Sequence, residues 1–307
     1  MNVCFIGKHK YPKDIFSNEQ DMKTWQSLGA YFDKIFVIAE SPDLFFHSWK
    51  EENVRIYLMP RLGYVGFIKC SVFWGVYLNL RYGVDVFDAS EIAGGGIAAT
   101  ILKFFAGKPT IIEVQGEIFR KAGNIEGLKS RFLKKIGRWT MKRAARVRVI
   151  SRAIFNQVKE QEVNESKIRL VSLRVDLNLF NPLLIYEINS FGDKVGIIKI
   201  GYIGRLVEGK GLEDLLVAIK ILKNQNLELG AWSLVIYGIG SLEMKLKKIA
   251  EELNIGDKIE WRGFIPYGKV PEALAQIDIF VYPSWHEGFG RSIMEALAME
   301  KEIVATR

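Results

Sequence analysis

Short apolar runs alternate with amphipathic segments of helical length along most of this chain. Runs typical of buried strands lie at 3–6, 35–39, 54–58, 84–87, 110–114 and 147–150, and again at 197–203, 233–237, 258–261 and 277–282. Helices are predicted between them at 96–106, 126–145, 212–224, 241–253 and 290–299. This alternation predicts parallel sheets with helices on their faces.

The alternation occurs in two rounds, which predicts two domains. The first round covers residues 1–180 and the second covers residues 197–307. Residues 181–196 between them contain Pro, Asn, Ser and two Gly residues, a composition typical of a linker. We therefore predict two Rossmann-like, doubly wound α/β domains with a ligand site in the cleft that they face.

Residues 62–80 are almost entirely apolar. Lys69 is the one charged residue among them, and the segment is long enough to span a bilayer. A Lys at the centre of a membrane helix costs about 2.5–3.5 kcal/mol, and the Gly, Ser and Asn residues of the segment weaken the case further. The pattern therefore favours a buried or membrane-facing helix of the first domain over a membrane span.

Length and composition agree with two globular domains. The 307 residues are 49% hydrophobic and 25% charged. The two Cys lie far apart and the three His are scattered, so a disulfide scaffold and a Cys- or His-rich metal centre are not expected. The first ten residues lack the apolar segment of a signal peptide, which favours a cytoplasmic protein.

The positive charge is concentrated in the first domain. Residues 1–180 contain 28 Lys and Arg against 18 Asp and Glu, whereas the rest of the chain contains 15 against 17. Aromatic residues interleave with a basic stretch from 129 to 148, as in an amphipathic helix at an anionic membrane. A scaffold helix with a solvated basic face explains the stretch equally well, and nucleic-acid binding is disfavoured because no recognition module is visible. The stretch contains no acid and nine cations: Lys129, Arg131, Lys134, Lys135, Arg138, Lys142, Arg143, Arg146 and Arg148.

A glycine-rich loop, GRLVEGKG at 204–211, follows a predicted strand and precedes a predicted helix. It mimics a P-loop, but Gly211 replaces the Ser or Thr whose hydroxyl would bind Mg²⁺. Arg205 and Lys210 remain as cations, and the positive end of the helix dipole lies beside them. The loop predicts a diphosphate site, and the alternative is a glycine-rich turn with solvated charges.

A second loop, EGFGRSIME at 287–295, follows the predicted strand 277–282. Glu287 and Glu295 flank its glycine-rich turn, which lies at the carboxyl edge of the sheet, where ligands bind. Paired carboxylates accept hydrogen bonds from the hydroxyls of a sugar or ribose. The alternative is that Glu295 is an exposed helical residue and that the helix dipole favours Glu287.

These two loops resemble those of the retaining GT-B glycosyltransferases of family 4. FIG at 5–7 and SLRVDLNLFNP at 172–182 extend the resemblance, with Asp176 and Phe180 at pattern positions and Arg174 where Gly is usual. The resemblance implies a GT-B-like fold, a nucleotide-sugar donor and transfer with retention. It also implies that no metal and no other cofactor is needed.

The resemblance assigns roles to the loop residues. Arg205, Lys210 and Glu287 are implied as the catalytic set, with the two cations on the diphosphate and Glu287 on the donor sugar. Glu295 is implied to bind the ribose hydroxyls, and the segment 262–265 to meet the base. The implied donor-binding residues are Gly204, Arg262, Gly263, Phe264, Ile265, Gly288, Phe289, Gly290 and Glu295.

The chain departs from the family pattern in three places. Gln115 stands where the family has a His in the first domain, and Gln cannot act as a base. Glu300-Lys301-Glu302 replaces the usual Gly-Lys-Pro, and the sequence stops at Arg307, so we expect an incomplete second domain. Gln115 and Gly7 are the candidates on the acceptor side.

The leading hypothesis is a glycosyltransferase of polysaccharide or glycolipid assembly at the cytoplasmic face of the membrane. Its partners would be a nucleotide-sugar donor, a lipid-linked or saccharide acceptor and an anionic membrane surface, without nucleic acid. The second hypothesis is a catalytically impaired remnant that binds nucleotide sugars. The third, a P-loop phosphotransferase, is disfavoured by Gly211.

Overall fold

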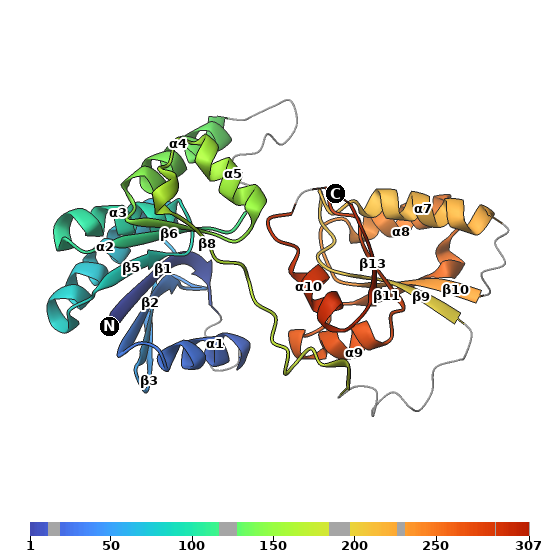
Figure 1. Ribbon diagram of the computed structural model, residues 1–307, viewed down its shortest axis with the longest axis horizontal. Coiled ribbons are helices and arrows are strands. Elements are labelled where there is room, and N and C mark those ends of the chain that lie inside the picture. Colours follow the sequence, from blue (N-terminus) through green and yellow to red (C-terminus); the bar gives the residue numbers. More distant parts are fainter. Residues whose placement is uncertain (12–18, 117–127, 184–196, 226–230, 286, 307) are drawn as a thin grey trace. The chain divides into compact units, whose positions relative to one another are not determined.

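The computed structural model describes residues 1–11, 19–116, 128–183, 197–225, 231–285 and 287–306. The chain forms two compact units, Met1–Ser172 and Leu173–Arg307 (Figure 1). Each unit is a parallel or mostly parallel sheet covered by helices, so the predicted α/β class is confirmed.

The first unit is built on an eight-stranded sheet in the order β3-β4-β2-β1-β5-β6-β7-β8. Neighbouring strands are parallel except for β3 and β4, which are antiparallel. The central strands are apolar on both faces and fully buried, as in β2, because helices cover both sides. The strands are β1 Asn2–Lys10, β2 Lys34–Glu40, β3 His47–Glu51, β4 Val54–Met59, β5 Val86–Ala89, β6 Thr110–Val114, β7 Arg146–Val149 and β8 Ile168–Leu170.

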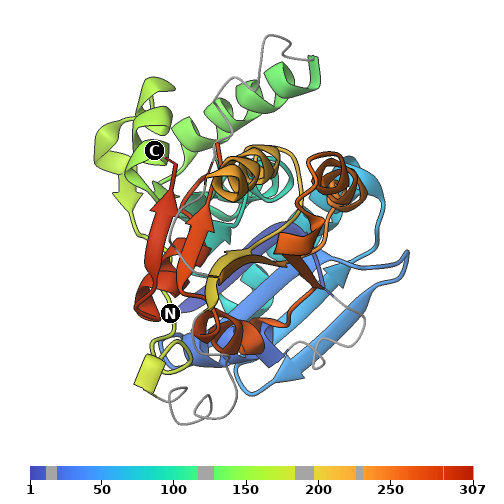
Figure 2. The same cartoon turned by 90° about the vertical axis from the view of Figure 1, so that its right-hand side faces the viewer.

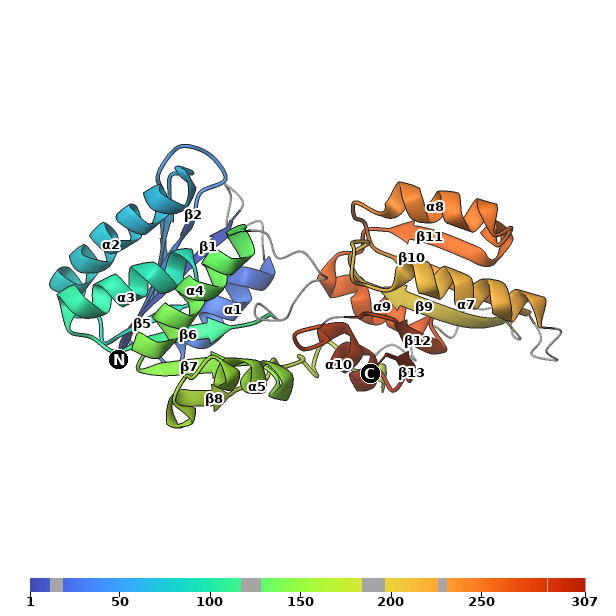
Figure 3. The ribbon, with the colours of Figure 1, turned by 90° about the horizontal axis from the view of Figure 1, so that it is seen from above.

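The helices of the first unit are α1 Glu19–Gly29, α2 Gly63–Tyr82, α3 Gly94–Ala106, α4 Leu128–Arg143 and α5 Arg152–Glu160. Helix α2 packs on β1, β2 and β4, and α3 packs on β1, β5 and β6. Helices α2, α3 and α4 lie side by side in one layer (Figure 3). None of the described helices combines the length and the hydropathy that a membrane crossing requires.

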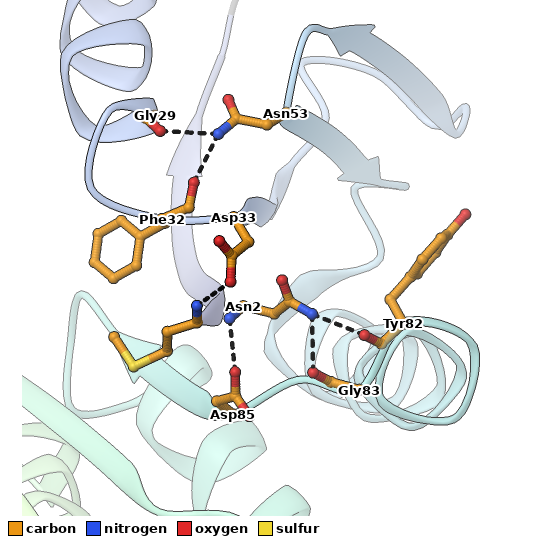
Figure 4. Close-up of polar contacts among 9 residues, drawn as sticks. Asn2, Gly29, Phe32, Asp33, Asn53, Tyr82, Gly83 and Asp85 are labelled. Atoms are coloured by element: carbon orange, nitrogen blue, oxygen red, sulfur yellow. Dashed lines mark hydrogen bonds and ion pairs between the residues drawn. The ribbon is translucent and has the colours of Figure 1, made fainter.

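Two asparagines tie loops together at the amino edge of the first sheet (Figure 4). The Asn2 amide donates to the carbonyls of Tyr82 (2.8 Å) and Gly83 (3.1 Å), so it satisfies carbonyls that the end of α2 leaves open. The Asn53 amide donates to the carbonyls of Gly29 (2.9 Å) and Phe32 (2.7 Å) in the same way. Both contacts fix where a helix ends relative to the next strand.

The second unit is built on a five-stranded parallel sheet in the order β11-β10-β9-β12-β13 (Figure 2). Its strands are β9 Ile197–Ile203, β10 Ala231–Tyr237, β11 Ile259–Gly263, β12 Ile279–Tyr282 and β13 Glu302–Ala305. Its helices are α7 Leu212–Asn224, α8 Glu243–Glu252, α9 Val270–Ala275 and α10 Arg291–Ala298. Apolar clusters fill both sides of this sheet.

The boundary between the units lies earlier than predicted. The first domain was expected to run to residue 180, but the first compact unit ends at Ser172. Phe180 is buried in the core of the second unit, and Val175 and Leu179 pack against that core. Apolar residues of 173–180 therefore join the second unit, and most of the predicted linker, residues 184–196, lies outside the described residues.

Candidate functional site

Two loops meet at the point in the second sheet where the strand order reverses. Strand β9 lies between β10 and β12, and the connections that leave β9 and β12 run in opposite directions along the sheet. The loop 204–211 follows β9 and leads into α7, and the loop 283–290 follows β12 and leads into α10. In open α/β sheets this crevice at the carboxyl ends of the strands is where ligands bind.

Backbone contacts hold the two loops against each other. The Trp285 amide donates to the Gly209 carbonyl (3.0 Å), and the Ser284 hydroxyl donates to the same carbonyl (3.2 Å). Gly211 has φ +63°, and a Cβ on it would lie 1.9 Å from the Pro283 carbonyl oxygen. Only glycine fits there, so this residue of the P-loop-like motif lets the loops approach instead of binding Mg²⁺.

Lys210 and Glu287 form an ion pair across the two loops. The Tyr282 hydroxyl donates to the same Glu287 oxygen, and the Lys210 ammonium lies 5.7 Å from the centre of the Tyr282 ring. Burial raises the pKa of Glu287, but the hydrogen bonds from Lys210 and Tyr282 outweigh it, so this pKa lies below its ordinary value. In this structure, therefore, a carboxylate neutralises the cation that was predicted to bind phosphate.

Arg205 lies at the start of the first loop with an exposed side chain. Its carbonyl accepts a hydrogen bond from the buried Tyr202 hydroxyl (3.0 Å), which fixes the backbone of the loop. The guanidinium forms no ion pair with a described carboxylate. The preceding Gly204 donates its amide to the Tyr237 carbonyl (3.0 Å), so the loop begins in register with β10.

Glu295 is buried on α10, and one of its oxygens has no hydrogen-bond partner within the described part of the structure. Burial raises the pKa of its carboxyl above the ordinary value of 4.5, although a hydrogen bond with Tyr267 and the charge of Arg291 act in the opposite direction. Burial and Glu295 raise the pKa of Tyr267 to about 12. The alternative of an exposed helical glutamate is wrong, and an unsatisfied buried carboxylate oxygen can accept a hydroxyl donor.

The turn of the second loop opens α10. Gly290 precedes the helix with φ +76°, and Gly288 and Phe289 are half-buried beside it. The amide of Gly288 contributes to the lowered pKa of Glu287. This part of the predicted donor set therefore surrounds the Lys210–Glu287 pair.

The segment implied to meet the base follows β11. Gly263 has φ +67° and its carbonyl accepts a hydrogen bond from the Gly238 amide (2.7 Å). Arg262 is paired with Glu260 (2.5 Å), Phe264 is 69% exposed and Ile265 packs against the core. Strand β10 lies between β11 and β9, so the usual spacing of strands places β11 about 10 Å from β9, the strand that precedes the first loop.

The candidates of the first unit are Gly7, which lies within strand β1, and Gln115, which directly follows the last residue of β6. Gln115 follows β6, and its amide donates to the buried Glu113 carboxylate (2.5 Å). Arg148 on β7 also binds Glu113. Gly7 lies in β1, where a Cβ would lie 1.9 Å from the Ser90 hydroxyl oxygen, so its missing side chain makes room for the β5–α3 turn.

The glycine-rich turn of the first unit is occupied by a carboxylate of the chain itself. Glu91 accepts hydrogen bonds from the amides of Ala93 (2.7 Å), Gly94 (3.0 Å) and Gly95 (2.5 Å) at the start of α3. A Cβ on Gly95 would lie 2.4 Å from the carbonyl oxygen of Ile6 on β1. In the first sheet the strand order reverses between β1 and β5, and three amides at the start of α3, which follows β5, are thus already satisfied.

The predicted basic stretch divides between two elements. Arg148 points from β7 to Glu113 and does not belong to the basic surface, which corrects that part of the prediction. On α4, Lys142 is paired with Glu162 (2.7 Å) and Arg138 donates to Gln161 (2.8 Å). The other described cations of α4 lie on a helix that contains no acidic residue.

Sequence reasoning missed the aromatic residues that support the site. Tyr282 and Tyr267 bind the two glutamates, and the Trp285 indole donates to Asp214 (2.7 Å). A tyrosine at the last position of a strand, directly before the loop, was a readable signal for Tyr282. Within the described residues no group of His, Cys, Asp or Glu is arranged to hold a metal ion, and His286 lies outside them.

Comparison with known proteins adds independent information. Residues 188–307 match the family model described as Glycosyl transferases group 1. An uncharacterized glycosyltransferase of Methanocaldococcus jannaschii is 28% identical over 283 residues, which are 84% of this chain and 68% of that protein. The amylovoran biosynthesis glycosyltransferase AmsK of Erwinia amylovora is 32% identical over 115 residues, which are 36% of this chain and 28% of that protein.

A solved structure extends the likeness to the whole chain. The HepE protein of Anabaena, in complex with UDP-glucose, has a TM-score of 0.72 and 17% sequence identity with this chain. The match covers 99% of this chain and 80% of that one. This likeness confirms the predicted fold class across both units.

Proposed function

We propose that this chain, which has a GT-B-like fold, belongs to the glycosyl transferases group 1 family and transfers a sugar from a nucleotide-sugar donor to a lipid-linked or saccharide acceptor. We place it among the retaining enzymes of family 4, acting in polysaccharide or glycolipid assembly. The observation that carries the proposal is the meeting of the two loops at the strand-order reversal, with an ion pair and a buried carboxylate, one oxygen of which has no partner among the described residues.

The residues of the two loops suit a nucleoside diphosphate sugar. Arg205 and Lys210 would bind the diphosphate and stabilise the negative charge that develops on the leaving group. Lys210 would exchange its partner Glu287 for phosphate, which would free the Glu287 carboxylate to accept hydrogen bonds from the donor sugar. The amides of Gly288, Phe289 and Gly290 would contact the phosphate and the sugar.

The buried Glu295 suits the ribose. Its unpartnered oxygen lies in a site from which water is largely excluded, so a ribose hydroxyl that donates to it would satisfy a group that is otherwise unpaired. The base would lie against the segment 262–265, where Phe264 offers an exposed ring, and Gly204 would contact the donor with its backbone. We propose that the reaction needs no metal ion and no cofactor beyond the donor.

The acceptor would bind to the first unit, with Gln115 and Gly7 at the edge where it enters. The relative from Erwinia amylovora is named for amylovoran biosynthesis, which supports a saccharide acceptor. The structural neighbour was solved in complex with UDP-glucose, which supports a nucleotide-sugar donor. We place the protein in the cytoplasm, as a peripheral protein on the inner face of the membrane.

The first test is calorimetric titration with UDP-, GDP- and ADP-sugars in the absence of metal ions. One nucleotide class should bind in the micromolar range, about −8 kcal/mol. Glu295→Ala and Lys210→Ala should each weaken this binding, whereas Lys245→Ala, which removes an exposed ion pair on α8, should leave it unchanged. Equal affinity in all variants would overturn the site assignment.

A second candidate function is a binding protein without turnover. Gln115 favours it, because an amide cannot act as a base, and its nearest carboxylate, Glu113, is engaged by Arg148. Both candidates predict donor binding. Release of nucleoside diphosphate from the bound donor in the presence of acceptor would exclude the binding protein.

A further inference from the structure

The outer face of α2 is apolar where surface helices are normally polar. Its inner side is buried on the sheet, but Val65, Phe73, Tyr77 and Leu80 are 67%, 69%, 45% and 81% exposed. At 100° per residue these four side chains and Lys69 lie within about 120° of one another around the helix. The stripe from Val65 to Leu80 is about 22 Å long.

Helix α3 also exposes large apolar side chains. Phe104 and Phe105, in the last turn of α3, are 85% and 70% exposed. Helices α2 and α3 pack side by side (Figure 3), and Leu80 and these two rings belong to the last turns of the two helices. Two helices that pack together thus expose several large apolar side chains, and a group of exposed apolar side chains of this kind marks an interaction site.

The charge of the three-helix layer has one sign. Helices α2, α3 and α4 contain no Asp or Glu, and they carry ten Lys and Arg residues. On α4 the Arg143 guanidinium lies 4.9 Å from the centre of the Trp139 ring, which is itself 39% exposed. Lys103 of α3 donates to the Arg143 carbonyl (2.5 Å), and this hydrogen bond connects α3 with the end of the basic helix α4.

We propose that the outer face of α2, α3 and α4 docks on an anionic lipid bilayer. The inference deepens the proposed function, since it names the surface by which the protein would reach the membrane. Aromatic side chains beside Lys and Arg match the interface of a bilayer, where rings enter the headgroup region and cations meet lipid phosphates. The absence of carboxylates from all three helices favours this occupant, because an anionic membrane repels acidic residues.

Flotation with lipid vesicles tests the proposal without any nucleotide. The protein should float with vesicles of phosphatidylglycerol and phosphatidylcholine at low salt, and binding should fall by at least about tenfold with phosphatidylcholine alone or at high salt. Phe73→Ser with Tyr77→Ser, and separately Phe104→Ser with Phe105→Ser, should each weaken partitioning about tenfold, since each pair removes apolar area that the bilayer buries.

Two control variants distinguish docking through this surface from adsorption elsewhere on the protein. Met244→Ser on α8, a residue that is 78% exposed in the second unit, should leave vesicle binding unchanged. Arg131→Gln with Lys135→Gln and Arg143→Gln should abolish the preference for phosphatidylglycerol. All variants should keep wild-type donor affinity in calorimetry, so failure of the membrane proposal and failure of the donor proposal give different results.

Three outcomes would overturn the inference. The first is that wild-type protein does not float with phosphatidylglycerol vesicles at low salt. The second is that both aromatic double variants bind vesicles as well as the wild type. The third is that the protein does not bind vesicles and light scattering finds a dimer that is lost in the Phe73→Ser, Tyr77→Ser variant. The stripe would then be a protein interface.

Discussion

Replacing Glu287 with Gln should tighten the binding of UDP, whereas replacing Lys210 with Met should weaken it. The two side chains form one ion pair, with exposed fractions of 32% for Glu287 and 16% for Lys210. If Lys210 binds the diphosphate, then Glu287 competes with the phosphate for the same ammonium group. Removal of the competing carboxylate must then raise the affinity for UDP, whereas removal of the binding cation must lower it.

The size of the effect follows from the charges. Coulomb's law with an effective dielectric constant of about 20 gives about 3 kcal/mol of repulsion between the Glu287 carboxylate and a phosphate charge about 6 Å away. Partial exposure of the pair reduces this to about 1 kcal/mol, which corresponds to a roughly fivefold lower Kd in the Gln variant. Because the pKa of Glu287 is lowered, the carboxylate is ionised at neutral pH and the gain is fully present there.

Calorimetric titration with UDP measures the effect, and UDP is used because it lacks the sugar that Glu287 would also contact. Lys245→Met is the matched control, since Lys245 forms an exposed ion pair with Glu213 between α8 and α7. It should not change the affinity. If Glu287→Gln weakened UDP binding as much as Lys210→Met does, Glu287 would position Lys210 and would not compete with phosphate, and the reasoning would be refuted.

Three further predictions concern stability in urea or on heating. Because burial raises the pKa of Glu295, the folded state binds more protons than the unfolded state, and its free energy of unfolding falls as pH rises above 4.5. Glu295→Gln should therefore raise the free energy of unfolding by about 1 kcal/mol at pH 7 and leave it unchanged below pH 4. An equal increase at both pH values would contradict this reasoning. Gly211→Ala should lower the free energy of unfolding by about 3 kcal/mol. Gly209→Ala should lower it less, because φ of Gly209 is also positive but its Cβ would meet open space. Equal losses in the two variants would exclude a steric clash at Gly211. Asn2→Ala should cost about 1–2 kcal/mol through the two carbonyls at the end of α2, and an unchanged unfolding midpoint would mean that water replaces the amide.

The strands and helices of the two sheet centres were predictable because their apolar periods are strong. The predicted helix at 212–224 coincides with α7, and the predicted strand at 197–203 coincides with β9. The edge strands β3, β8 and β13 were missed, since their residues alternate polar and apolar or lie at the surface and give no continuous apolar run.

The site was predictable as two loops but not as a set of contacts. Lys210 and Glu287 are 77 residues apart, and their pairing depends on β9 and β12 lying side by side, which the motifs alone do not state. The burial of Glu295 likewise depends on Tyr267, which enters from the segment before α9. The boundary at residue 172 was missed because 173–180 has loop-like composition yet buries Phe180 in the second core.

The Glu91 carboxylate at the start of α3 has a consequence for the number of nucleotides that the chain can hold. A group tethered by two or three residues acts at an effective concentration in the millimolar range, so a free anion at micromolar concentration cannot displace it from the amides of Ala93, Gly94 and Gly95. The two units thus each have a glycine-rich turn that leads from a strand into a helix, and in the first unit a carboxylate of the chain itself occupies the amides of that turn. If the second unit binds its donor as proposed, this difference between the two units gives a stoichiometry of one nucleotide per chain.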